Sequence, residues 1–251
     1  MLGIPIATSG IAGFDIAFYP GDQAVQWLWD NSNMWWMGYY LMVAGPGFSN
    51  KATWQGKFEH LRSIGWGVAP IYVGKQPTSL KLKQRAGKEF HEGLADGAEA
   101  CRSAVLAQVP RTTVLYFDLE YGHTTKRWLE YFWGWVTAVL NQQYVAGLYC
   151  SYLVAGAVES YIKERGIQVS PDPVPVIWAF HPTLTPTTHK DMNAIPAPLP
   201  LGSGTMSAVN WQFAQHAGIH YINEERPKKP KVHLTVDLNS SYHKDPGTRS
   251  S

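Results

Sequence analysis

The clearest strand in the sequence reads Thr112-Thr113-Val114-Leu115-Tyr116-Phe117-Asp118-Leu119-Glu120. It is a short run rich in β-branched and aromatic residues, which is typical of a buried strand. A long amphipathic helical pattern follows at Lys126–Gln142. A strand followed directly by a helix is the repeating unit of parallel α/β sheets.

Seven further short apolar runs read as strands, and helical patterns separate most of them. The runs are Ile11–Phe18, Tyr39–Ala44, Trp66–Val73, Val145–Ser151, Val174–Phe180, Val209–Ala214 and His233–Leu238. Eight strands and about five helices in 251 residues predict a single, mostly parallel α/β barrel of the (β/α)8 or TIM type, which takes about 250 residues. The alternative is an open doubly wound sheet, although no GxGxxG segment follows the first run to support it.

Two segments depart from this alternation. Residues 181–206 are rich in Pro, Thr and Gly and contain no convincing helical pattern, which predicts a long loop or a degraded helical layer after the sixth strand. The residues from Tyr242 onward have the composition of a tail. We therefore expect one barrel domain over residues 1–241 and a C-terminal tail over residues 242–251.

Composition excludes several classes of protein. With 45% hydrophobic and 16% charged residues, the chain can bury a sizeable core, so disorder is not expected. The net charge of +2 is too small for a nucleic-acid-binding protein, and the basic residues are scattered apart from one late cluster, which comprises Arg226, Lys228, Lys229 and Lys231. No apolar run approaches the roughly 20 residues of a membrane span.

The chain ends and the cysteines add little. The first residues, Met1–Pro5, lack the basic region of a signal peptide, so the sequence alone leaves the localisation open. Cys101 and Cys150 are too few for a disulfide framework and match no zinc motif. We expect both to be buried free thiols.

Polar side chains recur at the C-terminal ends of the predicted strands. They are Asp15, Gln76, Asp118, Glu120, Tyr149, Gln212 and Asp237. Ionisable groups are costly inside parallel strands, which are buried on both faces. Since this rim carries the active site in nearly every TIM-barrel enzyme, the pattern predicts a site there.

The pair Asp118 and Glu120 is the sharpest feature. Alternate residues of a strand face the same way, about 6–7 Å apart along the backbone, so both carboxylates point to one side. Two carboxylates on one rim suit glycoside hydrolysis, in which one donates a proton and the other supports the reacting carbon. Two other interpretations remain open: a structural pair bound by Arg or Lys, and a metal site that needs a third oxygen ligand.

The sequence contains no motif of the other common catalytic classes. The sequence has no GxSxG, Walker A or HExxH segment, and we expect neither a metal nor a cofactor. Trp178 and Trp211 lie inside the sixth and seventh predicted strands, where they would be placed to stack on a sugar ring.

Four segments resemble a known family. Gly13-Phe14-Asp15, Pro70-Ile71-Tyr72-Val73-Gly74-Lys75-Gln76, Tyr116-Phe117-Asp118-Leu119-Glu120-Tyr121 and Gly147-Leu148-Tyr149-Cys150-Ser151 are similar to the glycoside-hydrolase-like domains catalogued as DUF1906. That family is related to the GH25 lysozymes (muramidases). The resemblance extends from about residue 11 to residue 240.

The resemblance implies roles for individual residues. Glu120 matches the general acid of the muramidases, Asp118 the neighbouring carboxylate, and Asp15 and Asp237 the acidic residues of the first and last strands. It implies hydrolysis of a β-1,4 bond in an N-acetylated polysaccharide, such as peptidoglycan or a chitin-like glycan, with help from the substrate's own N-acetyl group. It also implies an extracellular or cell-wall location. The substrate contacts we expect are Gln76, Tyr121, Tyr149, Trp178, Trp211 and Gln212.

Two functions of other classes fit the same fold. The first is a catalytically inactive carbohydrate-binding or cell-wall-associated module, which would keep a tryptophan platform without a working acid. The second is a structural subunit of a larger assembly, suggested by the long loops and the basic cluster near the C-terminus.

Overall fold

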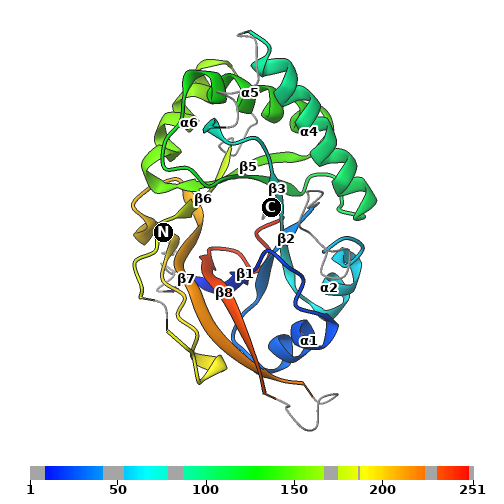
Figure 1. Cartoon of the computed structure of the whole chain (residues 1–251), viewed down its shortest axis with the longest axis vertical. Coiled ribbons are helices and arrows are strands. Elements are labelled where there is room, and N and C mark those ends of the chain that lie inside the picture. Colours follow the sequence, from blue (N-terminus) through cyan, green and yellow to red (C-terminus); the bar gives the residue numbers. More distant parts are fainter. Residues whose placement is uncertain are drawn as a thin grey trace, which may run out of the picture.

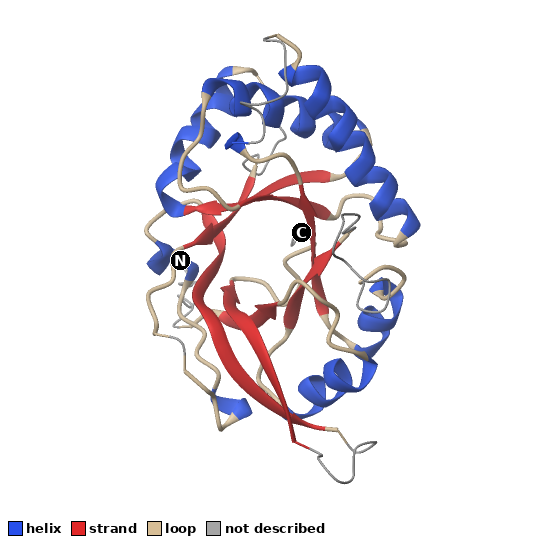
Figure 2. Cartoon of the chain, in the orientation of Figure 1, coloured by secondary structure: helices blue, strands red, loops and turns tan. Residues whose placement is uncertain are grey.

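A computed structural model of the chain describes residues 9–41, 54–78, 87–166, 175–185, 187–223 and 231–248. Eight strands close into one barrel in chain order, with helices outside them (Figures 1 and 2). The predicted α/β barrel is therefore confirmed. The strands are β1 (Ile11–Asp15), β2 (Trp36–Tyr40), β3 (Gly67–Val73), β4 (Val114–Leu119), β5 (Val145–Ser151), β6 (Val176–Phe180), β7 (Ala208–Ile222) and β8 (Lys231–Ser241).

Five α-helices surround the barrel within the described residues. They are α1 (Asp22–Asn31), α2 (Phe58–Ile64), α4 (Glu89–Leu106), α5 (Lys126–Asn141) and α6 (Tyr152–Glu164). Side-chain caps from Thr125 and Ser151 begin α5 and α6, because each oxygen accepts a hydrogen bond from a free N–H of the first turn. None of these helices combines the length and the apolar character that a bilayer crossing requires.

The side of the barrel beside β7 is covered by an irregular segment instead of a helix (yellow in Figure 1). In the described part of residues 181–206, the only helical turns are the 3-10 turns η2 (Met192–Ala194) and η3 (Pro200–Ser203). Backbone hydrogen bonds from Thr183 to Phe213 and from His189 to Gly218 hold this segment against β7. The degraded helical layer expected here is confirmed.

The last strand departs from the mostly parallel prediction. Strands β1 to β7 run parallel, whereas β8 is antiparallel to both β7 and β1. The reason is that β7 continues for 15 residues to Ile222, and β8 returns from the far end of this hairpin. Asp237 therefore does not end its strand: it lies partway down β8, opposite Asp15.

Aromatic rings fill the barrel interior. Trp36, Tyr116 and Trp178 come from β2, β4 and β6, and Trp178 meets the other two rings edge-on at centroid distances of 5.2 and 5.5 Å. Glycines leave the room for them. A Cβ atom at Gly13 would lie 2.4 Å from Trp36, and one at Gly147 would lie 2.6 Å from Tyr116.

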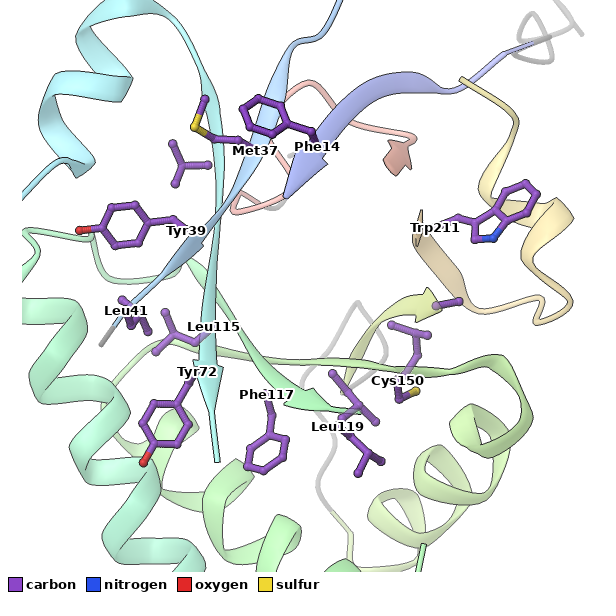
Figure 3. Packing of buried hydrophobic residues seen from close by; sticks show 14 of the residues in the cluster. Phe14, Met37, Tyr39, Leu41, Tyr72, Leu115, Phe117, Leu119, Cys150 and Trp211 are labelled. Atoms are coloured by element: carbon purple, nitrogen blue, oxygen red, sulfur yellow. The ribbon is translucent and has the colours of Figure 1, made fainter. Parts of the chain in front are cut away.

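The larger core lies between the barrel and its helices. Figure 3 shows outward-facing side chains of this layer, among them Tyr72 and Phe117. Phe117 lies edge-on to four rings of α5, at centroid distances of 5.4 to 5.9 Å; they are Trp128, Tyr131, Phe132 and Trp135. Strand alternation thus separates an outward core residue, Phe117, from its inward neighbour Asp118. Cys101 and Cys150 are buried free thiols, as expected.

Residues 242–248 pack beneath the barrel. The hydroxyl of Tyr116 donates to the carbonyl of Pro246 (2.9 Å), and the N–H of Val114 donates to the carbonyl of Gly247 (2.8 Å). Arg62 forms an ion pair with Asp245. The boundary placed between the barrel and a C-terminal tail stays a prediction, and residues 249–251 lie outside the described residues, as do Met1–Pro5 and, of the basic cluster, Arg226, Lys228 and Lys229.

A glycine substitution tests the tightness of the interior. At Gly38 an added Cβ atom would lie 2.7 Å from the Cβ of Asp15 and 2.9 Å from Ile71, so we expect Gly38→Ala to lower the unfolding free energy by about 1–3 kcal/mol through overpacking. Gly156→Ala makes the same change in α6 with nothing within 4 Å, and should raise stability by up to about 1 kcal/mol. Urea unfolding measures both, and equal effects would contradict this account of the interior.

Candidate active site

Three of the four predicted carboxylates share the carboxyl-end rim of the barrel. Asp15 is the last residue of β1, Asp118 is the penultimate residue of β4, and Asp237 lies opposite Asp15 in the β1–β8 register. Asp15 and Asp118 are 7% and 5% exposed. The charge of each of these two carboxylates acts on the hydroxyls of Tyr40 and Tyr149, which places all four groups around one site.

Asp15 is held by two neighbours. The side-chain N–H of Asn239 donates to its Oδ2 at 2.8 Å, and the hydroxyl of Tyr40 donates to its Oδ1 at 3.3 Å. Burial, and next the charge of Asp237, raise the pKa of the Asp15 carboxyl to about 7, while these two hydrogen bonds act in the opposite direction. Asp15 therefore takes up a proton close to neutral pH.

Asp237 is fixed by an amide and by the backbone. Gln212 donates from Nε2 to Oδ2 at 2.7 Å, and the backbone N–H of His216 donates to Oδ1 at 2.8 Å. Tyr149 donates to the Oε1 of Gln212, which sets the orientation of that amide. Burial raises the pKa of the Asp237 carboxyl, and the hydrogen bonds from His216 and Gln212 lower it.

Asp118 has an oxygen without a partner. Its Oδ1 is fully buried and receives no hydrogen bond from the described residues. Burial raises the pKa of Asp118 well above its ordinary value, and the charges of Glu120 and Asp15 raise it further. A buried acceptor of this kind is costly to leave unpaired, so it favours a bound molecule that donates a hydrogen bond to it.

Glu120 differs from the other three carboxylates because it is exposed. It follows the last residue of β4, and its backbone N–H donates to the Oε1 of Gln76 at 3.1 Å. The neighbouring Tyr121 is partly buried, with its ring edge-on to His123 at 5.8 Å. The site thus combines an exposed carboxyl with three more deeply placed ones.

Within the described residues, no ion pair holds this cluster. Asp15, Asp118, Glu120 and Asp237 form no ion pair with a described Lys, Arg or His. Nor does the part of the chain that the structure describes hold a group of three or more His, Cys, Asp or Glu side chains arranged for a metal ion. The Arg or Lys partner that the structural interpretation requires is therefore not found among the described residues.

The two tryptophans do not fit the predicted sugar platform. Trp178 is fully buried in the barrel interior, where its Nε1 donates to Asn239 at 3.0 Å. Trp211 points outward and is 5% exposed, with its Nε1 donating to the carbonyl of His181. It packs against η3, where a Cβ atom at Gly202 would lie 2.8 Å from its ring. Because neither indole offers a free face, the expectation that they stack on a sugar is corrected.

The sequence analysis does not name Tyr40 as a site residue. The inward alternation of β2 runs through Trp36, Gly38 and Tyr40, whereas the predicted strand begins at Tyr39. The signal for Tyr40 was the period of two that located Asp118 and Glu120. Asn239, which the sequence places with Asp237 at the end of the last strand, occupies the next inward position of β8 after Asp237.

Comparison with known proteins places the chain among glycoside hydrolase-like domains. The model of the family described as "Rv2525c-like, glycoside hydrolase-like domain" matches residues 27–241. An uncharacterized protein of B. stearothermophilus has a similar structure, with 23% identity and a TM-score of 0.63 over 92% of this chain and 96% of the other. No curated protein matches the chain.

Two more solved structures share the fold at 13% identity. The Tat-secreted protein Rv2525c of Mycobacterium tuberculosis, in complex with HEPES, aligns over 96% of this chain and 98% of its own with a TM-score of 0.51. The spore cortex lytic enzyme SleM of Clostridium perfringens aligns over 95% of this chain and 69% of its own with a TM-score of 0.55. At these identities the likeness concerns the fold.

The raised pKa of Asp15 predicts how stability depends on pH. The folded carboxyl has a pKa of about 7, against about 3.9 when unfolded, so between these values the folded state binds more protons. Its contribution to the unfolding free energy therefore falls as the pH rises from about 4 to about 7. Asp15→Asn removes this loss, and we expect the variant to be more stable than the wild type by about 1–3 kcal/mol at pH 8.

At pH 4 the two proteins should differ little, because the wild-type carboxyl is then protonated. Urea midpoints at pH 4, 6 and 8 make the measurement, and Asp30→Asn, on the exposed face of α1, is the control. A gain that is the same at all three pH values would show that Asp15 does not titrate as described.

Proposed function

Because the chain belongs to the Rv2525c-like, glycoside hydrolase-like domain family, we propose that it hydrolyses β-1,4 bonds in an N-acetylated polysaccharide such as peptidoglycan or a chitin-like glycan. The observation that carries the proposal is the pairing of an exposed Glu120 with a buried Asp118 whose Oδ1 has no partner. Proton donation and support of a cationic carbon are the two tasks that glycoside hydrolysis divides between carboxyl groups.

In the proposed reaction, Glu120 donates its proton to the glycosidic oxygen as the bond from this oxygen to the anomeric carbon breaks. The carbonyl oxygen of the substrate's 2-acetamido group bonds to the anomeric carbon, and the acetamido N–H donates to Oδ1 of Asp118. A water molecule then attacks the anomeric carbon, the bond from this carbon to the acetamido oxygen breaks and re-forms the acetamido carbonyl, and the water gives a proton to the Glu120 carboxylate. Each proton taken from Glu120 is replaced, so the site is restored after one turnover.

The burial of Asp118 makes this arrangement selective for the transition state. Ionising Asp118 in the empty site is costly, because burial and the charges of Glu120 and Asp15 disfavour its anion. A positive charge that develops on the sugar and its acetamido group offsets that cost. The interaction is stronger in the transition state than with the neutral substrate, and such a difference in binding is what lowers a barrier.

Asp15 and Asp237 supply further negative potential from the opposite side of the rim. Their hydrogen bonds to Tyr40, Asn239 and Gln212 fix the carboxyl groups before any ligand binds. Groups held in place beforehand cost little reorganisation during the reaction. In this scheme Tyr149 acts by orienting Gln212, and contact of either residue with the glycan remains a proposal.

The proposed class of substrate is supported by a protein with a similar structure. SleM is named a spore cortex lytic enzyme, and its barrel aligns with nearly the whole of this chain. From the shared family and the arrangement of the carboxylates, we propose that the substrate of this chain is also a cell-wall glycan. The tryptophan platform that would favour a purely carbohydrate-binding module is absent at Trp178 and Trp211.

Release of new reducing ends from peptidoglycan and from N-acetylglucosamine oligomers tests the proposal. We expect activity in the wild type and a loss of at least about 100-fold in kcat for Glu120→Gln, since an amide cannot donate the proton. Asp118→Asn should lose activity to a similar degree, because it removes the charge that supports the cationic carbon. Glu59→Gln makes the same change as Glu120→Gln on the exposed face of α2 and should leave the rate unchanged.

Two outcomes would contradict the proposal. If the wild type releases no reducing ends from either glycan but binds it, the barrel is a carbohydrate-binding module. If Glu120→Gln is as active as the wild type, Glu120 is not the proton donor.

A further inference from the structure

We infer that Gln76 is a positioning residue that fixes the backbone carrying Glu120, rather than a contact for substrate. Its Nε2 donates to the carbonyl of Asp118 at 2.7 Å, and its Oε1 accepts from the N–H of Glu120 at 3.1 Å. One amide side chain thereby holds the backbone on both sides of Leu119. The inference rests on the proposed role of Glu120 as proton donor.

The side chain of Gln76 continues the strand pairing where the backbone leaves it. The β3–β4 register runs from Ile71 opposite Tyr116 to Val73 opposite Asp118. Beyond Val73 the chain turns away, and the primary amide of Gln76 supplies the donor and the acceptor that the next peptide of β3 would have offered. The end of β4 is therefore paired although the strand beside it has ended.

The turn that carries Gln76 is fitted closely to the helices behind it. A Cβ atom at Gly74 would lie 2.1 Å from the ring of Phe117, so this position admits only glycine without displacement. The backbone N–H of Lys75 donates to the hydroxyl of Tyr131 at 3.2 Å. The backbone carbonyl of Lys75 accepts a hydrogen bond from Nε1 of Trp128 at 3.0 Å. Helix α5 thus anchors the backbone directly before Gln76.

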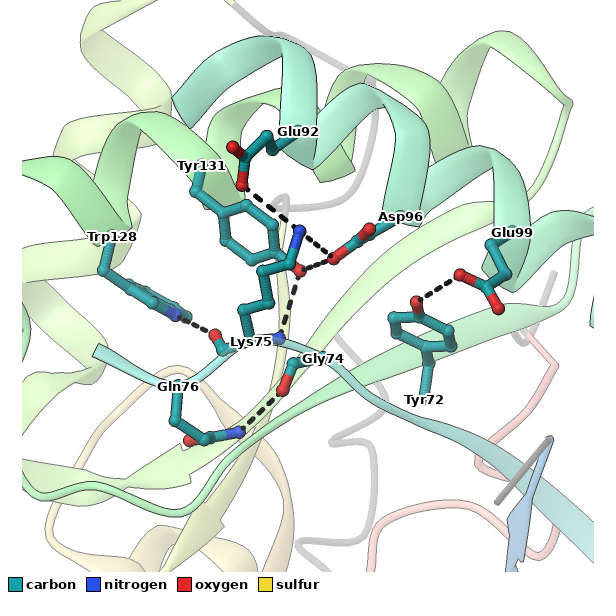
Figure 4. A network of polar contacts seen from close by, with 9 residues as sticks. All are labelled: Tyr72, Gly74, Lys75, Gln76, Glu92, Asp96, Glu99, Trp128 and Tyr131. Atoms are coloured by element: carbon teal, nitrogen blue, oxygen red, sulfur yellow. Dashed lines mark hydrogen bonds and ion pairs between the residues drawn. The ribbon is translucent and has the colours of Figure 1, made fainter. Parts of the chain in front are cut away.

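The side chain of Lys75 adds a second anchor, on α4. Figure 4 shows it pointing away from Gln76, toward the helices. Its Nζ lies 3.2 Å from Glu92 and 3.3 Å from Asp96, and Asp96 also accepts from the hydroxyl of Tyr131 at 2.7 Å. The network of Lys75, Glu92, Asp96 and Tyr131 therefore connects α4 and α5 to the turn that presents Gln76.

This placement separates two tasks at the end of β4. The side chain of Glu120 is free to meet a ligand, whereas its backbone is held by Gln76. A misplacement of about 1 Å costs roughly 100-fold in rate when a reacting group must be aligned. Loss of the clamp should therefore lower kcat more than it raises KM, because glycan binding along the rim does not require Glu120 to be aligned for proton transfer.

Amide hydrogen exchange tests the clamp without reference to activity. In the wild type the N–H of Glu120 should be protected, and Gln76→Ala should raise its exchange rate about five- to tenfold, which corresponds to one lost hydrogen bond. The N–H groups of Phe117 and Leu119 within β4 should be unchanged. Gln142→Ala, at an exposed amide just after α5, is the control. An unprotected Glu120 amide in the wild type would overturn the inference.

Kinetics test the consequence. We expect Gln76→Ala to lower kcat about 10- to 100-fold with KM changed less than about threefold. Lys75→Met should lower kcat by a smaller factor, and in a Gln76→Ala background it should have no further effect, because it acts through the same turn. A KM effect larger than the kcat effect would assign Gln76 to substrate binding instead, and additive losses would show that Lys75 acts independently.

The two experiments keep this inference apart from the proposed function. If the wild type cleaves no glycan while the Glu120 amide is protected by Gln76, the clamp stands and the hydrolase proposal fails. If the wild type cleaves glycan and Gln76→Ala retains full kcat, the hydrolase proposal stands and the positioning role fails.

Discussion

The indole of Trp178 fills the interior of the barrel beneath the carboxylates, and the placement of the site depends on it. Its ring meets Trp36 and Tyr116 edge-on, and it also meets Tyr149, whose hydroxyl belongs to the site. Its Nε1 donates to Asn239, which in turn donates to Asp15. The aromatic packing of the interior and the orientation of the carboxylates are therefore parts of one arrangement, since the same side chains support both.

The rim above this packing carries groups that do not favour stability. Burial raises the pKa of Asp15, Asp118 and Asp237, so each carboxylate is costly in its ionised form. Asp118 is also left with an unpaired oxygen. Perturbed carboxyl groups gathered at one end of a barrel, with no ion pair to them among the described residues, are what a site that stabilises positive charge requires.

The sequence predicted the barrel and the position of its main carboxylates. Strand alternation, and polar residues at the carboxyl ends of strands, are local patterns that a sequence shows directly. Asp118 and Glu120 needed only the period of two. The direction of β8 was not predictable, because a hairpin and a crossover connection leave similar apolar runs in the sequence. Nor could the sequence show that Trp178 points inward to a sealed interior and Trp211 outward to η3, since burial depends on what packs opposite each strand.

The most direct measurement of the central claim is a crystal structure of Glu120→Gln with an N-acetylglucosamine oligomer bound across the rim. We predict an acetamido N–H about 2.7–3.2 Å from Oδ1 of Asp118, with the glycosidic oxygen within similar reach of residue 120. The oxygen that is unpaired in the free protein would then have its partner. An oligomer bound away from Asp118, or one that leaves this oxygen without a hydrogen bond, would contradict the account.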